Sequence, residues 1–194
     1  MKKNLYILVI AGVLLQSCND QTVKDPTVAL PKEYEACCGV QPVDFKLGKH
    51  SIYVPNVFTP NGDGINDLFY PFVSAEIGEV QGLTIFSAVG DTILFQRSTL
   101  VYSRLSEFAW NGRRNNGSIY STLYRGKFKY GMRVVSKDGL LRFVEGEACS
   151  ILCEPGTKDL KVKKGCFFPN QVGQGNKAGI LDSTAANGEK DCLK

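Results

Sequence analysis

The chain has 194 residues, of which 43% are hydrophobic, and its formal net charge at pH 7 is +4. Loss of a leader containing Lys2 and Lys3 would lower that charge to +2. A nearly neutral chain lacks the strongly basic surface on which nucleic-acid binding depends, so we expect no nucleic-acid partner.

Residues 1–17 have the pattern of a lipoprotein signal peptide. Lys2 and Lys3 precede an apolar run from Leu5 to Leu15, which is too short for a permanent transmembrane helix. The sequence LQSC follows at residues 15–18 and resembles a bacterial lipobox, in which the cysteine is lipidated and becomes the new N-terminus. We therefore expect lipidation of Cys18 and anchoring of the protein to a membrane through its acyl chains. An ordinary secretory signal with a chance cysteine is the alternative.

Residues 18–47 are predicted to form a lipidated tether that also carries Cys37 and Cys38. The part from residue 19 to residue 36 is polar, contains two prolines and shows no hydrophobic periodicity.

Six cysteines remain once Cys18 is set aside: Cys37, Cys38, Cys149, Cys153, Cys166 and Cys192. An even number in an oxidising compartment predicts up to three disulfides. A bridge between the neighbours Cys37 and Cys38 would be strained, so each should find a distant partner. Cys149 and Cys153 are the favoured partners, which leaves Cys166 to pair with Cys192. A zinc site is disfavoured, because no Cys-x2-Cys pair occurs and the sole histidine, His50, is not suitably spaced.

Residues 48–148 are predicted to form a domain of short strands. The segments SIYVPNVF (51–58) and DLFYPFV (67–73) are rich in β-branched and aromatic residues, and Pro55 and Pro71 favour edge or bulged strands there. The segment LTIFSAVGDTILF (83–95) predicts a hairpin that turns near Gly90 and Asp91.

A second hairpin is predicted from KFKYGMRVVSKDGLLRFVEG (127–146). Apolar residues occupy every second position from Phe128 to Val134, and Asp138-Gly139 is a favoured type I′ turn pair. Several short strands with almost no helical periodicity predict an all-β fold, an antiparallel β-sandwich of about 100 residues. Residues 149–194 lose the alternation and are expected to form a loop-rich extension stabilised by disulfides.

The loop between the first two strand segments gathers four oxygen-bearing side chains: Asn61, Asp63, Asn66 and Asp67. Such a set could hold calcium, but the EF-hand spacing fails because its third oxygen position falls on Ile65. The favoured interpretation is a tight turn in which these side chains bind nearby backbone amides.

These segments, taken in order, resemble the gliding motility-associated C-terminal domain, which is the type B sorting domain of the Bacteroidota type IX secretion system. The resemblance covers about residues 50–147 and is carried by VPNVFTPNGDGINDLFYPF (54–72), the two hairpin segments, and WNGRRNNG (110–117). It implies an immunoglobulin-like fold and a location in the cell envelope. Together with the lipobox, it leads us to expect a lipid anchor at the outer membrane. The chain departs from the family pattern at two motifs, with SAVG (87–90) in place of an xRWG turn and WNG (110–112) in place of WDG. It also departs in its organisation, because residues follow the domain, no passenger precedes it and it is fused to a lipobox.

The sequence contains no recognised catalytic motif, so we expect a non-enzymatic protein. The main hypothesis is a binding or assembly module with an envelope protein or a glycan as its partner. One alternative is a small cargo of the type IX secretion system that uses the domain as a sorting signal. Another is carbohydrate binding at Trp110, Tyr120 and Tyr124, although a sandwich more often buries its tryptophan in the core.

Overall fold

The structure is a computed structural model that describes residues 28–39, 42–114, 121–190 and 192–193. Cys18 and Tyr120 lie outside the described residues, so the predictions made for them stay predictions. Within the described part, most regular structure is strand, which confirms the all-β prediction. No helix in this part is long and apolar enough to cross a membrane.

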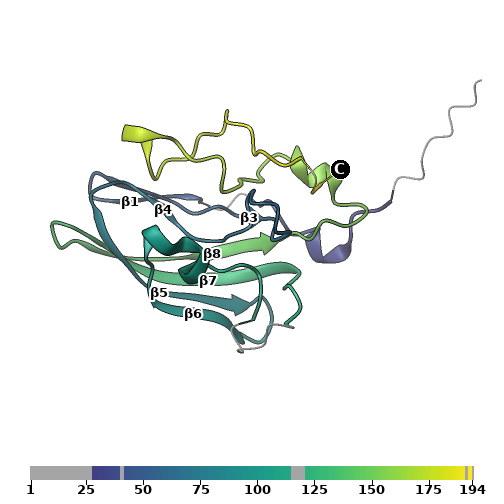
Figure 1. The fold of residues 1–194 in the computed structure, drawn as a ribbon, viewed down its shortest axis with the longest axis horizontal. Helices are drawn as coiled ribbons and strands as arrows, with labels where there is room; N and C mark the ends of the chain where they lie inside the picture. Colours follow the sequence, from purple (N-terminus) through teal and green to yellow (C-terminus); the bar gives the residue numbers. More distant parts are fainter. Residues whose placement is uncertain (1–27, 40–41, 115–120, 191, 194) are drawn as a thin grey trace, which may run out of the picture.

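The strands form two sheets (Figure 1). The three-stranded sheet has the order β1-β2-β4 and consists of β1 (Asp44–Leu47), β2 (His50–Tyr53) and β4 (Phe72–Val73). The five-stranded sheet has the order β3-β8-β7-β5-β6 and consists of β3 (Val57–Phe58), β8 (Leu141–Ser150), β7 (Gly126–Ser136), β5 (Ile77–Ser87) and β6 (Ile93–Thr99). The pairing is antiparallel except between β3 and β8, which run parallel, so the prediction of a wholly antiparallel fold is wrong at this edge.

Short helices connect and follow the strands. They are η1 (Lys32–Tyr34), η2 (Tyr102–Arg104), α1 (Leu105–Phe108), η3 (Lys158–Lys161) and η4 (Gly175–Lys177). None exceeds four residues, as expected of segments without helical periodicity.

Both predicted hairpins are present, but their turns differ from expectation. Gly139 has a φ of 86°, whereas Asp138 does not have a positive φ, and the Gly139 amide donates to the Ser136 carbonyl at 3.0 Å. The β7–β8 connection is therefore a type I turn followed by a left-handed glycine, not a type I′ turn. A type I′ turn needs two successive residues with positive φ, and Gly90 and Asp91 in the β5–β6 connection have this conformation.

The chain changes sheets at Pro55. Residues before it form β2, which is the central strand of its sheet, so the prediction of an edge strand is wrong there. Pro55 lies just beyond β2 and therefore removes no hydrogen bond from the ladder. Pro71 precedes β4, which does lie at a sheet edge.

One hydrophobic core fills the space between the sheets, and its centre is aromatic. Trp110 is fully buried and its ring lies 5.4 Å from that of Phe58 and 4.8 Å from that of Phe128. Its indole Nε1 donates to the Arg113 carbonyl at 2.7 Å, which satisfies the one polar atom of the side chain. Trp110 is thus a core residue, the alternative favoured from sequence.

The predicted tether is too long at its C-terminal end. Tyr34 in η1 is fully buried, and β1 lies within the residues assigned to the tether. The extension that follows β8 runs over the three-stranded sheet on the side away from the five-stranded sheet (Figure 1). It is held there by a hydrogen bond from the Tyr53 hydroxyl to the Phe168 carbonyl at 2.7 Å.

Candidate functional site

The outer face of the five-stranded sheet carries a shallow hollow of about 340 Å³. Three strands line it: β5 with Gln81, Gly82, Thr84 and Phe86, β7 with Gly131, Met132 and Arg133, and β8 with Phe143, Val144 and Glu145. Gly131 pairs with Thr84 on one side and with Glu145 on the other. A Cβ at Gly131 would meet no atom within 4 Å, so the missing side chain leaves the hollow open at its floor.

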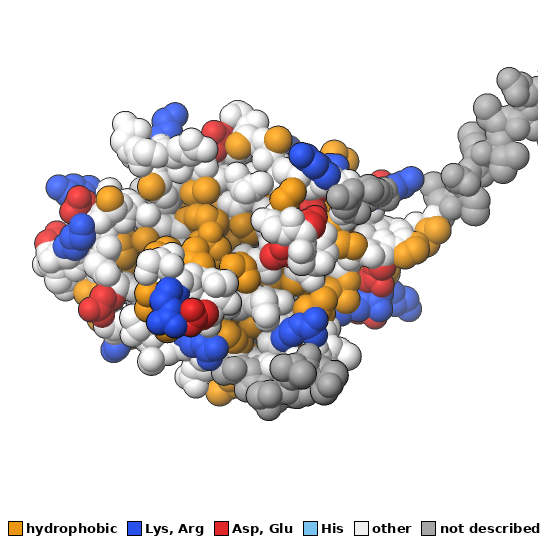
Figure 2. Space-filling model, in the orientation of Figure 1, with side chains coloured by type: hydrophobic (Ala, Val, Ile, Leu, Met, Phe, Trp, Pro, Cys, Tyr) orange, Lys and Arg blue, Asp and Glu red, His pale blue; other side chains and the backbone are white. Residues whose placement is uncertain are grey.

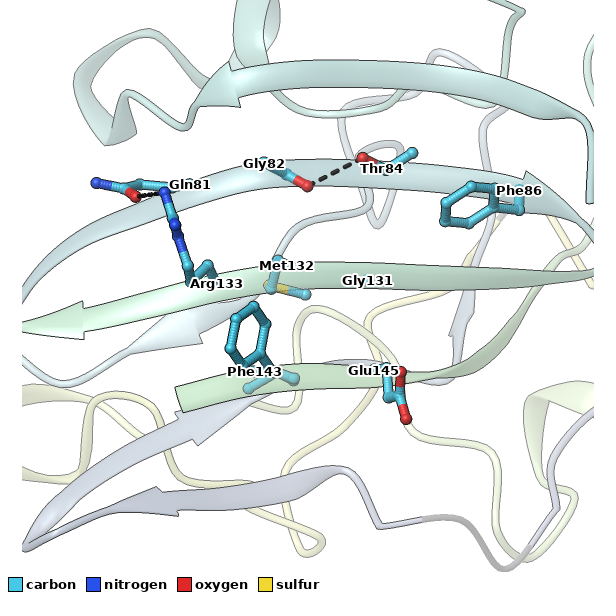
Figure 3. A pocket seen from close by; sticks show the side chains of 10 residues that line it. Gln81, Gly82, Thr84, Phe86, Gly131, Met132, Arg133, Phe143 and Glu145 are labelled. Carbon is cyan, nitrogen blue, oxygen red and sulfur yellow. Dashed lines mark hydrogen bonds between the residues drawn. The ribbon is translucent and has the colours of Figure 1, made fainter. Parts of the chain in front are cut away.

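Phe143 is the prominent hydrophobic residue at the rim, with 73% of its surface exposed. Figure 3 shows its ring leaning from β8 toward β7. An aromatic ring so exposed on a sheet face is the kind of surface that marks a contact with a partner or ligand.

Polar side chains frame the hollow. The Arg133 guanidinium donates to the Gln81 side-chain oxygen, and Gln81 in turn donates to Glu79, so these groups are held in place on the sheet. Glu145 lies on β8, across β7 from Gln81 (Figure 3). The described lining also includes Thr84, whose hydroxyl donates to the Gly82 carbonyl at 3.0 Å, so the hollow offers polar as well as apolar contacts for binding.

Sequence reasoning missed Phe143, although the sequence contains a signal for it. The alternation of β7 places Met132 inward and Arg133 outward, and Arg133 pairs with Phe143 in the hairpin. A residue that pairs with an outward residue also faces outward. The hairpin register would therefore have placed this aromatic ring on the polar face.

Trp110 and Tyr124, the two residues proposed for glycan binding that the structure describes, do not form such a site. Trp110 has no exposed ring face, so the prediction of sugar stacking on it is wrong. Tyr124 is half-buried, and its hydroxyl donates to the Lys127 carbonyl at 2.9 Å and accepts from the Ala88 amide at 3.2 Å. It closes the core beside Trp110, at a ring distance of 6.1 Å.

The acidic loop is a hydrogen-bonded turn. The two oxygens of Asp67 accept the Gly62 and Gly64 amides, each at 2.6 Å. Asp63 accepts the Ile65 amide at 2.8 Å, and Asn61 accepts the Asp63 amide at 3.1 Å. These bonds are those of the turn favoured from sequence. The described residues contain no group of three or more His, Cys, Asp or Glu arranged to hold a metal, and calcium binding stays a prediction.

Asn66 faces away from that turn and binds the extension. Its side-chain amide donates to Glu189 at 2.5 Å and to the Asn187 carbonyl at 2.8 Å. The same Glu189 oxygen, Oε1, accepts the Thr59 hydroxyl at 2.5 Å. Glu189 is only 3% exposed, and its Oε2 has no hydrogen-bond partner among the described residues. Burial raises the pKa of Glu189, the two hydrogen bonds oppose that rise, and nearby Asp63 and Asp67 add to it.

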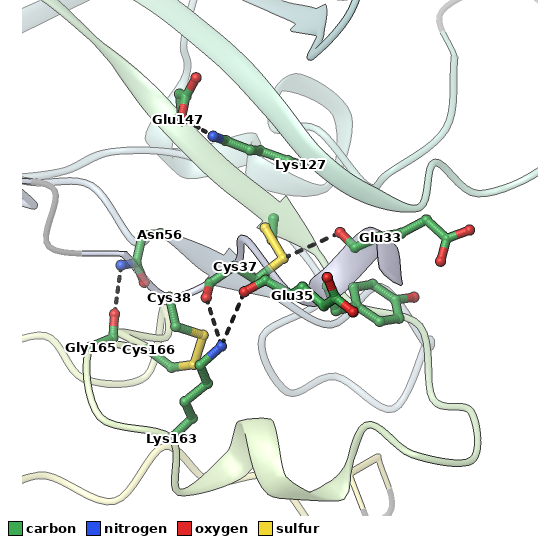
Figure 4. Close-up of a disulfide and its surroundings, with 12 residues drawn as sticks. Glu33, Glu35, Cys37, Cys38, Asn56, Lys127, Glu147, Lys163, Gly165 and Cys166 are labelled. Atoms are coloured by element: carbon green, nitrogen blue, oxygen red, sulfur yellow. Dashed lines mark hydrogen bonds and ion pairs between the residues drawn. A yellow bond between two sulfur atoms is a disulfide. The ribbon is translucent and has the colours of Figure 1, made fainter. Parts of the chain in front are cut away.

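The six cysteines other than Cys18 form three disulfides, with a pairing that differs in part from expectation. Cys37 pairs with Cys149, one of the two partners expected. The remaining pairs are Cys38 with Cys166 and Cys153 with Cys192, so the predicted Cys166–Cys192 bridge is wrong. The error has a physical reason: η1 lies beside both the end of β8 and the extension, so the adjacent cysteines point to different segments (Figure 4).

Two polar residues reinforce these bridges. Lys163 donates to the Cys37 carbonyl at 3.1 Å (Figure 4). Asn56 donates from Nδ2 to the Gly165 carbonyl and accepts the Phe167 amide at Oδ1, both at 2.7 Å. His50 is buried, with Nε2 3.9 Å from the nearest Asp138 oxygen.

The comparisons with known proteins give no relative for this arrangement. A scan against protein-family models found no match, and neither did searches of curated proteins and of solved structures.

Proposed function

We propose that this protein is a non-enzymatic, lipid-anchored binding or assembly module of the cell envelope, attached at the outer membrane through Cys18. The observation that carries the proposal is the open hollow beside Phe143 on the five-stranded sheet. The extension and its bridges cover the opposite sheet, which leaves this face for a partner. Three disulfides also suit a domain that works outside the cytoplasm.

We further infer that the fold is an immunoglobulin-like sandwich of the kind found in type B sorting domains. Two sheets facing each other over one core, with a tryptophan buried between them, support this inference. The sequence resemblance over about residues 50–147 supports the envelope setting. A protein or glycan of the envelope is the proposed partner, and its contact would centre on Phe143.

Site-directed photocrosslinking in intact cells tests the proposal. A benzoylphenylalanine at position 143 should yield a discrete adduct, and the same probe at position 162 should not. Val162 is a suitable control because it is 83% exposed but lies in the extension, away from the sheet face. Gly131→Leu in the position-143 background should remove the adduct, since the new side chain would project into the hollow from a position where an added Cβ meets no atom within 4 Å. Equal adducts from both positions, or none from position 143, would overturn the proposal.

A further inference from the structure

A second hollow, which we call the aromatic cleft, lies between the acidic loop, β4 and the extension. It has a volume of about 380 Å³, and its hydrophobic walls are Leu68, Tyr70, Phe72, Pro169 and Val172. Figure 2 shows hydrophobic side chains gathered near the middle of this face, between the extension and the segment that holds η2 and α1. The cleft therefore uses residues from the module and from the extension together.

Two aromatic rings, those of Tyr70 and Phe72, form one wall of the cleft, and neighbouring side chains hold them in position. Tyr70 and Phe72 have ring centroids 4.5 Å apart, and both side chains are half-buried, so part of each ring remains accessible. Phe72 stacks on Tyr53 at 5.7 Å, and Tyr53 is fully buried. Tyr102 packs edge-on against Tyr70, and its hydroxyl donates to the Pro71 carbonyl at 2.7 Å. A wall held in this way loses little entropy when it binds a ligand.

The charge of the cleft is negative. Asp67 is the one formally charged residue in the described lining, which contains no lysine, arginine or histidine. Each Asp67 oxygen accepts one loop amide and retains capacity for a further hydrogen bond. Asp63 and Asp67 both lie close enough to Glu189 to act on it electrostatically, so acidic residues gather at this end of the cleft.

We propose that the aromatic cleft binds a cationic side chain, lysine or arginine, from a segment of a partner protein. Aromatic faces attract cations, and a carboxylate at the end of the cleft complements the positive charge. The apolar walls at Leu68, Pro169 and Val172 suit the methylene stem of such a side chain. An anionic group is disfavoured by Asp67, and a neutral ligand gains nothing from the charge. The site is separate from the hollow at Phe143, so either proposal can fail without the other.

A titration followed by NMR chemical shifts tests this inference with the full oxidised chain in nonionic detergent. The probes are acetyl-Gly-Arg-Gly-amide and the same peptide with citrulline, which keeps the shape of arginine but lacks its charge. The arginine peptide should shift the amides of Asp67, Tyr70 and Asn170, and the citrulline peptide should bind at least tenfold more weakly. Equal affinity of the two peptides, or shifts located elsewhere, would overturn the proposal.

Two variants and one control complete the experiment. Tyr70→Leu removes an aromatic face but keeps an apolar wall, and it should weaken binding of the arginine peptide at least fivefold. Val172→Lys places a tethered cation in the cleft and should weaken binding at least tenfold, while the backbone bridge between Val172 and Leu181 remains. Phe143→Leu, on the other sheet, should leave the affinity unchanged. Unchanged affinity in Val172→Lys would contradict the proposal even if Tyr70→Leu failed to fold.

Discussion

Asn56 joins the extension to the point where the chain crosses between sheets. Its side chain is 5% exposed and makes two hydrogen bonds, to the Gly165 carbonyl and from the Phe167 amide. Alanine at this position removes both bonds and leaves a carbonyl and an amide without partners. We therefore expect Asn56→Ala to destabilise the protein, because the extension loses two of the hydrogen bonds that hold it to the sheets.

The magnitude follows from the two orphaned groups. Each unsatisfied buried polar group costs about 1–3 kcal/mol, and because Gly165 and Phe167 are themselves half-buried, the lower half of that range applies. The expected loss for the two groups together is then about 2–4 kcal/mol, which corresponds to a fall of roughly 4–16 °C in the thermal midpoint for a chain of this length. The matched control is Asn111→Ala, because Asn111 is exposed and its side chain accepts one amide, that of Arg113, at 3.2 Å.

Asn56→Asp gives the same prediction a dependence on pH. The aspartate would still accept the Phe167 amide, but its second oxygen would face the Gly165 carbonyl, and burial together with that repulsion would raise its pKa in the folded state. Because the folded state then binds the proton more tightly than the unfolded state, the stability of this variant should increase as the pH falls through the folded pKa. The protonated acid can donate to Gly165 and so restores the missing bond.

Urea denaturation with the disulfides intact, followed by tryptophan fluorescence, measures these free energies. The wild-type protein, Asn56→Ala, Asn56→Asp and Asn111→Ala should be compared between pH 4 and pH 7. If Asn56→Ala unfolds within about 0.5 kcal/mol of the wild type, or if acid fails to recover Asn56→Asp, then the Asn56 bonds do not hold the extension.

Four further predictions concern other parts of the chain. Burial raises the pKa of Glu189 above its ordinary 4.5, so wild-type stability should fall as the pH rises from about 4.5 through the folded pKa, and Glu189→Gln should remove that part of the pH dependence in urea denaturation. Gly179 has a φ of 74°, and an added Cβ would lie 2.5 Å from the Ser51 carbonyl oxygen. Gly175 also has a left-handed backbone, but the space around it is open, so Gly175→Ala should lower the free energy of unfolding by about 1–2 kcal/mol. Gly179→Ala should lower it by more, because the new methyl group also meets the Ser51 carbonyl. Calcium should leave the thermal midpoint unchanged, because hydrogen bonds from the loop amides to Asp63 and Asp67 already close the loop without an ion, and a rise would favour a bound ion. Intact-mass measurement should find acylated Cys18 and a chain that continues to Lys194, whereas an end near residue 147 would support a sorting signal.

The elements predicted well from sequence are those whose evidence is local. The β7–β8 hairpin follows from a period of two and a glycine-containing turn, all within 25 residues. The turn type was wrong because Asp-Gly suits more than one hairpin geometry, and the position of the left-handed residue decides between them. The edge strand predicted at Pro55 was wrong for a similar reason. A proline just outside a strand leaves the hydrogen bonds of the sheet intact, and the sequence alone does not show whether the strand ends before or after the proline.

Contacts between residues far apart in the chain were harder to predict from the sequence. Cys38 and Cys166 are separated by 128 residues, and no local pattern distinguishes this bridge from the other connectivities that six cysteines allow. Glu189 is similar, since it stands in a glycine- and asparagine-rich stretch that predicts an exposed loop. Its burial depends on Thr59 and Asn66, more than 120 residues earlier in the chain.

These long-range contacts make the extension part of the folded domain. A second hydrophobic cluster combines Tyr34 near the N-terminus, Val57 in β3, and Leu160 and Phe168 in the extension. Leu160 and Phe168 are fully buried, and complete burial of such side chains contributes about 1.5–3 kcal/mol each. A cut near residue 147 would remove both of them, together with cysteines from all three bridges. The remaining module would expose Tyr34 and Val57 to water, so the extension completes a hydrophobic cluster that the module alone cannot close.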